Sequence, residues 1–485
     1  MATNDVRTER LKKLALMKEV GMEPYPAESA RTHSNADFLL SFDTLANANT
    51  VTLCGRIMSL RDQGGLIFID LFDGTAKVQA IVKKDEIGDT AFDQLVSFVS
   101  VSDFVEITGN TFVTKRGMNS LLATAWRMIT KSLNQIPDEW FGLKDEDERY
   151  RHRYIDMLLN PEVADIVRMR SLFWNTIRQY LLTRNFIEVE TPVLENTTGG
   201  ADARPFSTHH NALDIDVFLR ISAGELWQKK LLVGGFPKVF EIGRIFRNEG
   251  MSREHLQDYT QLEFYIAYAD YIEGMKIARE LYLSIAQTVF GTTTFEIFGH
   301  TVNLADDWRI YRYSDVLKEH YNIDPLETSV EAIVSALTAA EIPFEARSMS
   351  IERGVDLLWK KVRKTISGPG FLVGVPVYLE PLAKRSREDG RVVERFQILL
   401  AGSEMGKGFS ELNDPVDQRE RFVRQQELRD AGDDEAQMAD MDFVEALEYG
   451  MPPAFGFGVS ERLFSFLCGI DVREGQIFPL MRPKN

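Results

Sequence analysis

The sequence predicts an α+β protein in which a small β-barrel precedes a larger domain of mixed strands and helices. Three observations lead to this prediction. The chain has 485 residues, more than one ordinary hydrophobic core accommodates. Residues 51–133 contain five short apolar runs separated by turns that contain Gly or Asp. After a polar and charged stretch, helical and strand-like patterns follow one another to the end of the chain.

The N-terminal stretch, residues 1–45, predicts a basic helix and a lead-in to the barrel. Residues 7–20 have the helical pattern, and Gly21, Pro24 and Pro26 follow it as helix breakers. The helix either exposes a solvated basic face or contacts phosphate, and the sequence leaves both open. Its basic residues are Arg7, Arg10, Lys12, Lys13 and Lys18.

The β-rich region, residues 46–135, predicts five strands with one helical stretch, "DEIGDTAFDQLVSFVS", between the third and the fourth. Five strands with a helix after the third is the layout of an OB-fold, a barrel that often binds nucleic acid. Many small β domains share this pattern. Residues 136–150 are polar and charged and predict a linker, so residues 151–485 form the second predicted domain.

Composition and charge exclude several classes of protein. The apolar fraction of 44% and the charged fraction of 27% are typical of a soluble globular chain. No apolar run is long enough to span a bilayer, and the charged N-terminus lacks the apolar core of a signal peptide. The two cysteines, Cys54 and Cys468, lie far apart, which argues against a disulfide scaffold or a zinc site. We therefore expect a cytoplasmic protein without membrane partners. The net charge of −17 argues against general nucleic-acid binding, although it permits a local basic surface.

The second domain opens with a predicted long helix and a predicted strand. Apolar residues from Ile166 to Leu181 recur at helical spacing. In "RNFIEVETPVL", Ile187, Val189 and Thr191 then alternate with acids before Pro192.

Polar residues at fixed spacing mark a predicted hairpin further along the chain. "KVFEIGRIFR" and "QLEFYIAY" read as antiparallel strands, with the polar loop "NEGMSREHLQDYT" between them. The strand period of two places Glu263 and Tyr265 on one face, where they point together into a cavity. Arg247 at the end of the first strand has the forked guanidinium that suits a phosphate.

Two C-terminal segments add to this constellation. "RFQILLAGSEMGKGFSELND" is strand-like and carries Glu404, Phe409 and Glu411. In "FGFGVSERLFSFL", two glycines precede Arg462 and an apolar helix, which would bring a nucleotide close to the backbone and supply a second phosphate ligand. Each feature alone has an ordinary structural explanation. Together they predict a site for a nucleotide and a cationic substrate.

Three segments resemble the signature motifs of class II aminoacyl-tRNA synthetases, namely "NFIEVETPVL", "FRNE…H" and "GFGVSER". Within that class the sequence is most similar to the lysyl-tRNA synthetases, over nearly the whole chain. The similar stretches include "GGADARPFSTHHNALDIDVFLRI", "GFPKVFEI", "EPLAKR", "GFSELNDPVDQRERF", "AGDDEA" and "FPLMRP". The resemblance implies an OB-fold anticodon-binding domain and a class II catalytic domain, an antiparallel sheet flanked by helices. It also implies that lysine is attached to tRNA(Lys) through a lysyl-adenylate.

The resemblance implies a role for each site residue. For ATP, Arg247 holds the α-phosphate, Glu249 the adenine edge and Tyr259 stacks near the adenine, while His255 and Arg462 meet the outer phosphates. Glu404 ligates Mg²⁺. The lysine-binding residues are Gly200, Glu225, Glu263, Tyr265, Phe409 and Glu411. Arg61, Phe68 and Gln79 match the anticodon-reading residues, and the alternative that Phe68 belongs to the barrel core stays open. The implied partners are lysine, ATP, tRNA(Lys) and a second copy of the chain, with Pro192 near the interface of a homodimer.

Several positions depart from the family pattern. Gln397 stands where a second metal-binding acid is usual, and Lys407 where an Asn would contact the substrate lysine. Val459 replaces a Gly, and Ala125 replaces a Glu of the barrel. The segment before Glu225 is one residue longer. These departures bear on metal number, specificity and anticodon reading.

Three alternative functions remain open from the sequence. An aspartyl- or asparaginyl-tRNA synthetase needs a cationic pocket, whereas Glu263 and Glu411 favour lysine and Lys407 alone points the other way. A lysine ligase that modifies an elongation factor lacks the barrel that this chain has. A non-catalytic RNA-binding paralogue would be expected to lose Arg247, Glu249 or Arg462, and all three are present.

Overall fold

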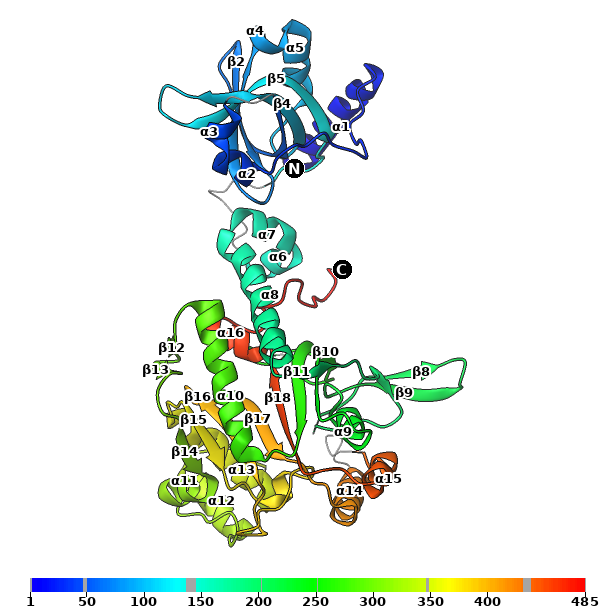
Figure 1. Ribbon diagram of the computed structural model, residues 1–485, viewed down its shortest axis with the longest axis vertical. Helices are drawn as coiled ribbons and strands as arrows, with labels where there is room; N and C mark the ends of the chain where they lie inside the picture. Colours follow the sequence, from blue (N-terminus) through cyan, green and yellow to red (C-terminus); the bar gives the residue numbers. More distant parts are fainter. Residues whose placement is uncertain are drawn as a thin grey trace. The chain divides into compact units, whose positions relative to one another are not determined.

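The computed structural model of the chain describes residues 2–46, 50–136, 145–201, 203–250, 252–345, 349–430 and 438–484 (Figure 1). The chain forms two compact units, residues 1–159 and 160–485. Most of the predicted linker, and the whole "AGDDEA" segment, lie outside the described residues. The predicted domain boundaries therefore stay predictions.

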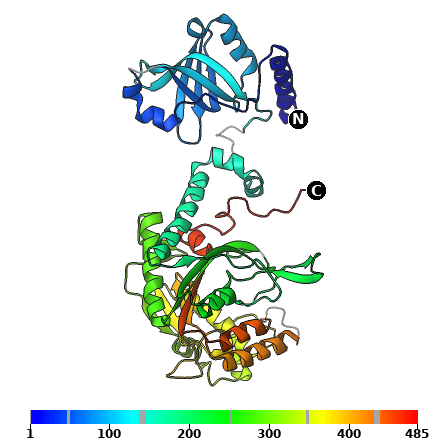
Figure 2. The same cartoon turned by 45° about the vertical axis from the view of Figure 1, so that its right-hand side comes forward.

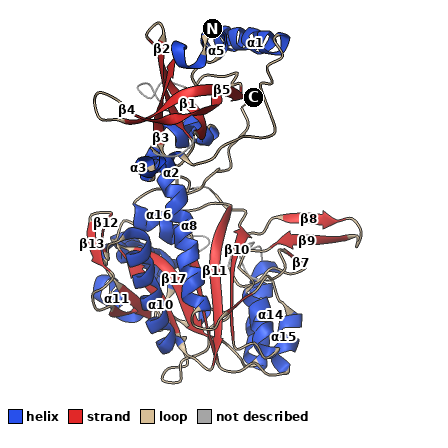
Figure 3. Ribbon diagram, turned by 45° about the horizontal axis from the view of Figure 1, so that its top comes forward, coloured by secondary structure: helices blue, strands red, loops and turns tan. Residues whose placement is uncertain are grey.

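The first unit contains a closed five-stranded barrel with strand order β1-β2-β3-β5-β4 (Figure 3). The alternating Ile67, Ile69 and Leu71 point inward and are fully buried, which is why this run forms a barrel strand. The predicted OB-fold is confirmed, including the helix after the third strand. The elements are α1 (Ala2–Glu19), α2 (Asn35–Leu40), α3 (Phe42–Leu45), β1 (Val51–Asp62), β2 (Leu66–Phe72), β3 (Lys77–Lys83), α4 (Lys84–Ile87), α5 (Asp89–Phe98), β4 (Phe104–Val113), β5 (Asn119–Thr130), α6 (Glu146–Arg151) and α7 (Arg153–Leu159).

The basic helix α1 is attached to the barrel through one of its arginines. Arg10 is buried and donates to the Val101 carbonyl at 2.8 Å and to the Ser132 hydroxyl at 2.8 Å. Lys12, in contrast, is exposed. One cation of the helix is therefore structural, and a phosphate-binding role for the others stays a prediction.

The second unit is built on an eight-stranded sheet of order β14-β15-β16-β17-β18-β11-β10-β6. Its centre is antiparallel, as the sequence predicts. Both ends differ, because β6 pairs with β10 and β14 with β15 in parallel, so the sheet is mixed. The sheet strands are β6 (Ile187–Glu188), β10 (Lys238–Phe246), β11 (Asp258–Ala267), β14 (Arg309–Arg312), β15 (Gly370–Val373), β16 (Arg395–Leu400), β17 (Ser403–Ser410) and β18 (Ala454–Ser460).

Helices cover both faces of this sheet (Figure 2). On one face, α8 (Pro161–Leu182) and α10 (Tyr271–Ile285) pack on aromatic side chains that include Phe264 and Phe455. On the other, α9 (Glu225–Val233) and α13 (Ile351–Val362) share a core with Tyr265 and Phe409. The site therefore lies on the second face. The remaining elements are β7 (Leu194–Glu195), β8 (Ser207–His210), β9 (Ile215–Leu219), η1 (Ala286–Phe290), β12 (Thr294–Ile297), β13 (His300–Asn303), α11 (Tyr313–Tyr321), α12 (Val330–Ala339), η3 (Arg363–Thr365), η4 (Val377–Leu379), α14 (Pro415–Asp430), α15 (Met441–Glu448) and α16 (Arg462–Cys468).

The predicted strand before Pro192 is shorter than its alternating pattern indicates, because β6 ends at Glu188. Beyond it, the backbone N–H and the hydroxyl of Thr191 both donate to the buried carboxylate of Glu241, at 3.0 and 2.6 Å. Arg220 pairs with the same carboxylate at 2.5 Å. These contacts satisfy the backbone and replace the strand ladder.

Among the described residues, no helix is both long enough and apolar enough to cross a membrane.

Candidate active site

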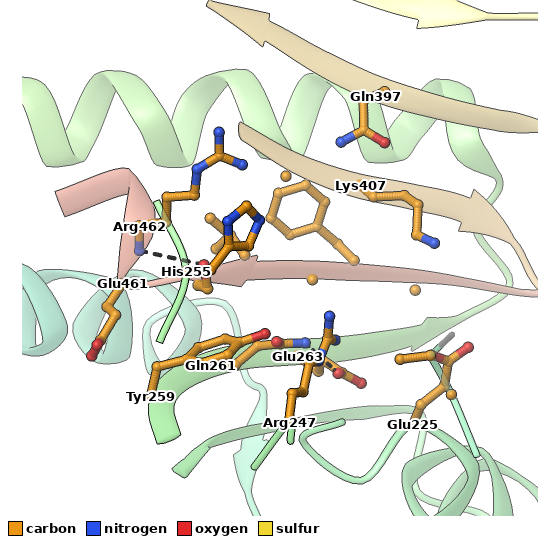
Figure 4. Close-up of a pocket in the computed structure, with 18 of the residues that line it drawn as sticks. Glu225, Arg247, His255, Tyr259, Gln261, Glu263, Gln397, Lys407, Glu461 and Arg462 are labelled. Carbon is orange, nitrogen blue, oxygen red and sulfur yellow. Dashed lines mark hydrogen bonds between the residues drawn. The ribbon is translucent and has the colours of Figure 1, made fainter. Parts of the chain in front are cut away.

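One cavity of about 410 Å³ opens on the second face of the sheet, between α9, the β10–β11 hairpin, β17, β18 and the start of α16. Figure 4 shows Arg247, Tyr259 and Glu263 on one wall, with Lys407 and Gln397 on the strands opposite. Segments far apart in the sequence thus meet, as the sequence predicts for one composite site. The predicted residues that line the cavity are Gly200, Glu225, Arg247, Glu249, His255, Tyr259, Glu263, Tyr265, Gln397, Phe409 and Arg462.

Glu263 forms the acidic end of the cavity. Its carboxylate is buried and accepts from the Ala223 N–H at 2.9 Å, the Gln261 amide at 2.6 Å and the Tyr265 hydroxyl at 3.0 Å. The pKa of Glu263 is raised to about 7, first by burial and then by the nearby carboxylate of Glu225, against the lowering effect of the bonds from Ala223 and Tyr265. The predicted Glu–Tyr pair therefore shares one face of β11 in a largely dehydrated environment.

Glu225 and Glu411 share a cation that belongs to the protein itself. The ammonium of Lys229 lies 2.9 Å from Glu225 and 2.6 Å from Glu411. Glu411 is fully buried and, unlike Glu225, does not line the cavity. Burial raises the pKa of Glu411 to about 8, and Lys229 opposes this increase. Burial alone would lower the pKa of Lys229, but the two carboxylates raise it above its usual range.

The glycine before the C-terminal helix makes room for acidic and aromatic side chains. A Cβ on Gly456 would lie 2.1 Å from the Glu411 carboxylate and 2.5 Å from the Tyr265 ring. A Cβ on Gly458 would make only ordinary contact, 3.5 Å from Glu263. The sequence assigned both glycines to the nucleotide, whereas Gly456 is required by the packing of the acidic end.

The opposite end of the cavity is cationic. Arg247 donates to the Ile221 carbonyl at 3.2 Å, and its guanidinium lies 5.8 Å from the centre of the Tyr259 ring. Arg462 begins α16, as predicted, and pairs with the carboxylate of Glu254 at 2.5 Å. Both arginines line the cavity and are held there by protein acceptors, the Ile221 carbonyl and the Glu254 carboxylate. A bound phosphate would compete with these acceptors or add to them.

His255 of the β10–β11 loop and Tyr259 of β11 lie beside these arginines. The Nδ1 atom of His255 lies 2.7 Å from the Ser252 hydroxyl. Burial, followed by the nearby positive charge of Arg462, lowers the pKa of His255. Burial raises the pKa of Tyr259, and Arg247 opposes the increase. At neutral pH these two side chains thus offer a neutral imidazole and a neutral phenol.

The predicted metal pair does not form an open acidic cage. Glu404 accepts from the Trp359 indole N–H at 2.6 Å and does not line the cavity. The amide oxygen of Gln397 accepts from Arg395 at 2.5 Å. Within the described residues, no cluster of three or more His, Cys, Asp or Glu side chains could hold a metal ion. The donor set suits a cation bound mainly by a substrate's phosphates.

Lys407, the departure that argued against a lysine pocket, has an internal partner. Its ammonium lies 3.4 Å from both oxygens of Glu380, which also pairs with Arg395 at 2.7 Å. Glu380 therefore faces two cations and compensates the charge of Lys407 only in part.

The three predicted anticodon residues share the outer face of the barrel. Arg61 pairs in register with Phe68, and the guanidinium lies 5.8 Å from the ring centre. Phe68 is half-buried and sits between the buried Ile67 and Ile69, so it is not part of the core. Gln79 pairs in register with Asp70, on the same face as Phe68.

Sequence reasoning missed five charged or polar residues of this site. Two had a usable signal, because Gln261 precedes Glu263 by one strand period and Lys229 follows Glu225 by one helical turn. Glu254 and Glu461 directly precede the predicted His255 and Arg462 in the sequence, whereas Glu380 reaches the site through tertiary structure alone. The missed residues are Lys229, Glu254, Gln261, Glu380 and Glu461.

Comparisons with known proteins agree with this geometry. Residues 145–482 match the family of class II tRNA synthetases (D, K and N), and residues 51–129 match the OB-fold nucleic acid binding domain. The lysine–tRNA ligase of Fervidobacterium nodosum is 42% identical over 99% of this chain and 94% of its own. That of Roseiflexus castenholzii is 41% identical over 100% of both chains, and that of Thermosipho africanus is 40% identical over 99% and 96%. The chain belongs to the lysine–tRNA ligase family of class II aminoacyl-tRNA synthetases.

Proposed function

We propose that this chain, as a lysine–tRNA ligase, activates lysine with ATP and transfers the lysyl group to tRNA(Lys). The observation that carries the proposal is the polarity of the cavity, with buried Glu263 and Tyr265 at one end and Arg247 and Arg462 at the other. An amino acid with a cationic side chain and a nucleotide triphosphate are complementary to these two ends. An aspartyl or asparaginyl enzyme would need the opposite charge at Glu263.

Lysine is bound by carboxylates in this proposal. Glu263 and Tyr265 receive the ε-ammonium, and Glu225 holds the α-ammonium beside Gly200. Phe409 packs against the aliphatic part of the substrate. An uncharged isostere would leave Glu263 buried without a cation, which costs free energy and underlies discrimination.

Activation proceeds by in-line attack. The lysine carboxylate attacks the α-phosphorus of ATP, forming lysyl-adenylate and releasing pyrophosphate. Arg247 holds the α-phosphate, Arg462 and His255 the outer phosphates, and Glu249 and Tyr259 the adenine. No enzyme nucleophile is required, so these residues act by positioning and by stabilising charge. The terminal ribose hydroxyl of the tRNA then takes the lysyl group.

Mg²⁺ would accompany the nucleotide. Glu404 is the one protein carboxylate assigned to it, with Gln397 beside it as a neutral donor, and the phosphates supply further oxygens. A bound Mg²⁺ neutralises phosphate charge.

Two further assignments complete the proposal. Arg61, Phe68 and Gln79 would bind anticodon bases by stacking and by hydrogen bonds to base edges, supported by their common outer face. The chain would act as a cytoplasmic homodimer. Support for a homodimer comes from exposed apolar side chains around Pro192, namely Ile187, Val193 and Leu194.

The test is amino-acid-dependent ATP–pyrophosphate exchange with each of the twenty amino acids. We expect exchange with lysine alone. Exchange with aspartate or asparagine would overturn the assignment of Glu263. If folded protein catalyses no exchange with any of the twenty amino acids, even after tRNA has been added, the result would favour a non-catalytic paralogue.

A further inference from the structure

The buried ammonium of Lys229 has no part in the function proposed so far. Its side chain is 1% exposed and lies on α9, one turn after Glu225. Besides Glu225 and Glu411, its neighbours are aromatic, with the rings of Tyr265, Phe409 and Phe443 centred 5.4–5.9 Å from the ammonium. The ammonium therefore lies directly behind the wall that Glu225, Tyr265 and Phe409 present to the cavity.

The charges around this ammonium do not cancel. Three carboxylates, Glu225, Glu263 and Glu411, and the phenol of Tyr265 act on one another across this end of the cavity. Lys229 is the cation that contacts two of the three acids. Glu263 instead has neutral donors, the Ala223 N–H, Gln261 and Tyr265. One acid would be enough to pair with a purely structural lysine. Here three acids surround one ammonium, and two of them, Glu225 and Glu263, line the cavity.

We propose that Lys229 is a positioning residue that holds the carboxylates of Glu225 and Glu411 in place at the acidic end of the cavity, so that the pocket selects an amino acid with a cationic side chain. The inference rests on the proposed function, because it concerns how the same pocket recognises lysine.

The physical reason is that buried carboxylates at close range do not all stay ionised without a cation. Like charges and burial both favour the protonated form, and an opposite charge favours the ionised form. The direction of the shifts agrees, since burial raises the pKa of Glu263 and Glu411 while Lys229 lowers both. If Lys229 lost its charge, these acids would take up protons and the pocket would become nearly neutral. A neutral pocket no longer distinguishes lysine from an uncharged analogue by charge.

Lys229 also holds the shape of the acidic end. Glu411 reaches the space beside Gly456 and Tyr265, and its carboxylate lies 2.6 Å from the ammonium of Lys229. Glu225 is the first residue of α9, and the same ammonium, one helical turn further along, donates a hydrogen bond to its carboxylate at 2.9 Å. An arginine at this position keeps the charge but not the compact shape, so it should restore function only partly.

The experiment compares Lys229→Met, Lys229→Gln and Lys229→Arg with Lys230→Met. Lys230 is the matched control, because it is the next residue on α9, is partly exposed and does not line the cavity; its ammonium lies 4.6 Å from the centre of the Trp227 ring. Each variant is assayed by ATP–pyrophosphate exchange for kcat/KM with lysine, for KM with ATP, and for inhibition by norleucine, which lacks the ε-ammonium.

We expect Lys229→Met to lower kcat/KM for lysine at neutral pH by at least about 30-fold and to leave KM for ATP within about twofold. Norleucine should inhibit at least about tenfold better relative to lysine, and the acidic limb of the lysine pH profile should move up by about one pH unit. Lys229→Arg should recover part of each change, and Lys230→Met should match the wild type.

Equal losses for lysine and ATP, with the pH profile and the norleucine ratio unmoved, would show a merely structural lysine and overturn the proposal. If Lys229→Met does not fold, the same readouts on Lys229→Gln and Lys229→Arg decide the matter. If the wild type does not exchange with lysine, the proposed function fails, and that outcome is distinct from a variant effect.

Discussion

The ion pair between Arg462 and Glu254 predicts that removing an acid will tighten ATP binding. Arg462 is the proposed ligand of the outer phosphates, yet its Nη2 atom already lies 2.5 Å from the Glu254 carboxylate. A triphosphate must displace this carboxylate before it can take the same position. The perturbation is Glu254→Gln, which keeps the side-chain size and removes the charge.

The magnitude follows from the exposure of the pair. The side chains of Arg462 and Glu254 are 22% and 38% exposed, so solvent screens their attraction. Measured pairs of this kind contribute about 0.2–1 kcal/mol, and partial burial places this one at about 0.5–1 kcal/mol. About 1.4 kcal/mol corresponds to a tenfold change in affinity, so Glu254→Gln should lower the Kd for ATP about two- to fivefold.

The assay is calorimetric titration of ATP into the enzyme without lysine, supported by KM for ATP in pyrophosphate exchange. Glu273→Gln is the matched control, because Glu273 pairs with exposed Lys276 at 3.1 Å and does not line the cavity. The effect of Glu254→Gln should shrink at high salt. An unchanged or weaker affinity for ATP would refute the reasoning and would indicate that Glu254 helps to bind the nucleotide.

Three other predictions concern the acidic end. Glu263→Gln should lower kcat/KM for lysine at least about 100-fold, because a buried ammonium loses its carboxylate, with KM for ATP unchanged in the same exchange assay. Gly456→Ala should reduce lysine-dependent exchange at least about tenfold, because the new Cβ meets the carboxylate of Glu411 and the Tyr265 ring, and thermal unfolding will show whether the fold survives. The pKa values of Glu263 and Glu411 are raised to about 7 and about 8, and the proposed function places the ε-ammonium of lysine against the ionised form of Glu263, with Glu411 behind the cavity wall. The kcat/KM for lysine, measured against pH, should therefore rise through these values and level above them, whereas a flat profile would contradict the assignment.

The sequence predicted the parts of the fold that depend on local patterns. The barrel strands alternate, the hairpin of β10 and β11 has the period that places Glu263 beside Tyr265, and α16 begins at Arg462 as expected. The strand before Pro192 was predicted too long, because the buried carboxylate of Glu241 takes the backbone donor of Thr191. Nothing local in the alternating pattern reveals a contact with a residue fifty positions away.

Of the site residues that the sequence analysis missed, some had a local sequence signal and others did not. Lys229 could have been found from its spacing to Glu225, since residues four apart share a helix face. Glu380 could not have been found in this way. It lies 27 positions before Lys407 and contacts that residue of β17 only in the folded structure. That contact also holds the ammonium of Lys407 near a carboxylate and so weakens the positive charge that a lysine substrate would meet.

The arrangement of charge along one hairpin determines how the substrate must lie. Arg247 follows the end of β10, and Glu263 lies five residues into the facing strand, so the backbone fixes the separation between the cationic and acidic ends. Lysine carries an ammonium on its side chain and a carboxylate at its α-carbon. With the ε-ammonium at Glu263, its carboxylate is repelled by the acids and attracted towards Arg247, where the proposed α-phosphate lies. The reversed pose would place the carboxylate against Glu263 and the ε-ammonium beside two arginines. The same charges that select lysine would therefore also orient it for attack, and a substrate with an acidic side chain would meet repulsion in either pose.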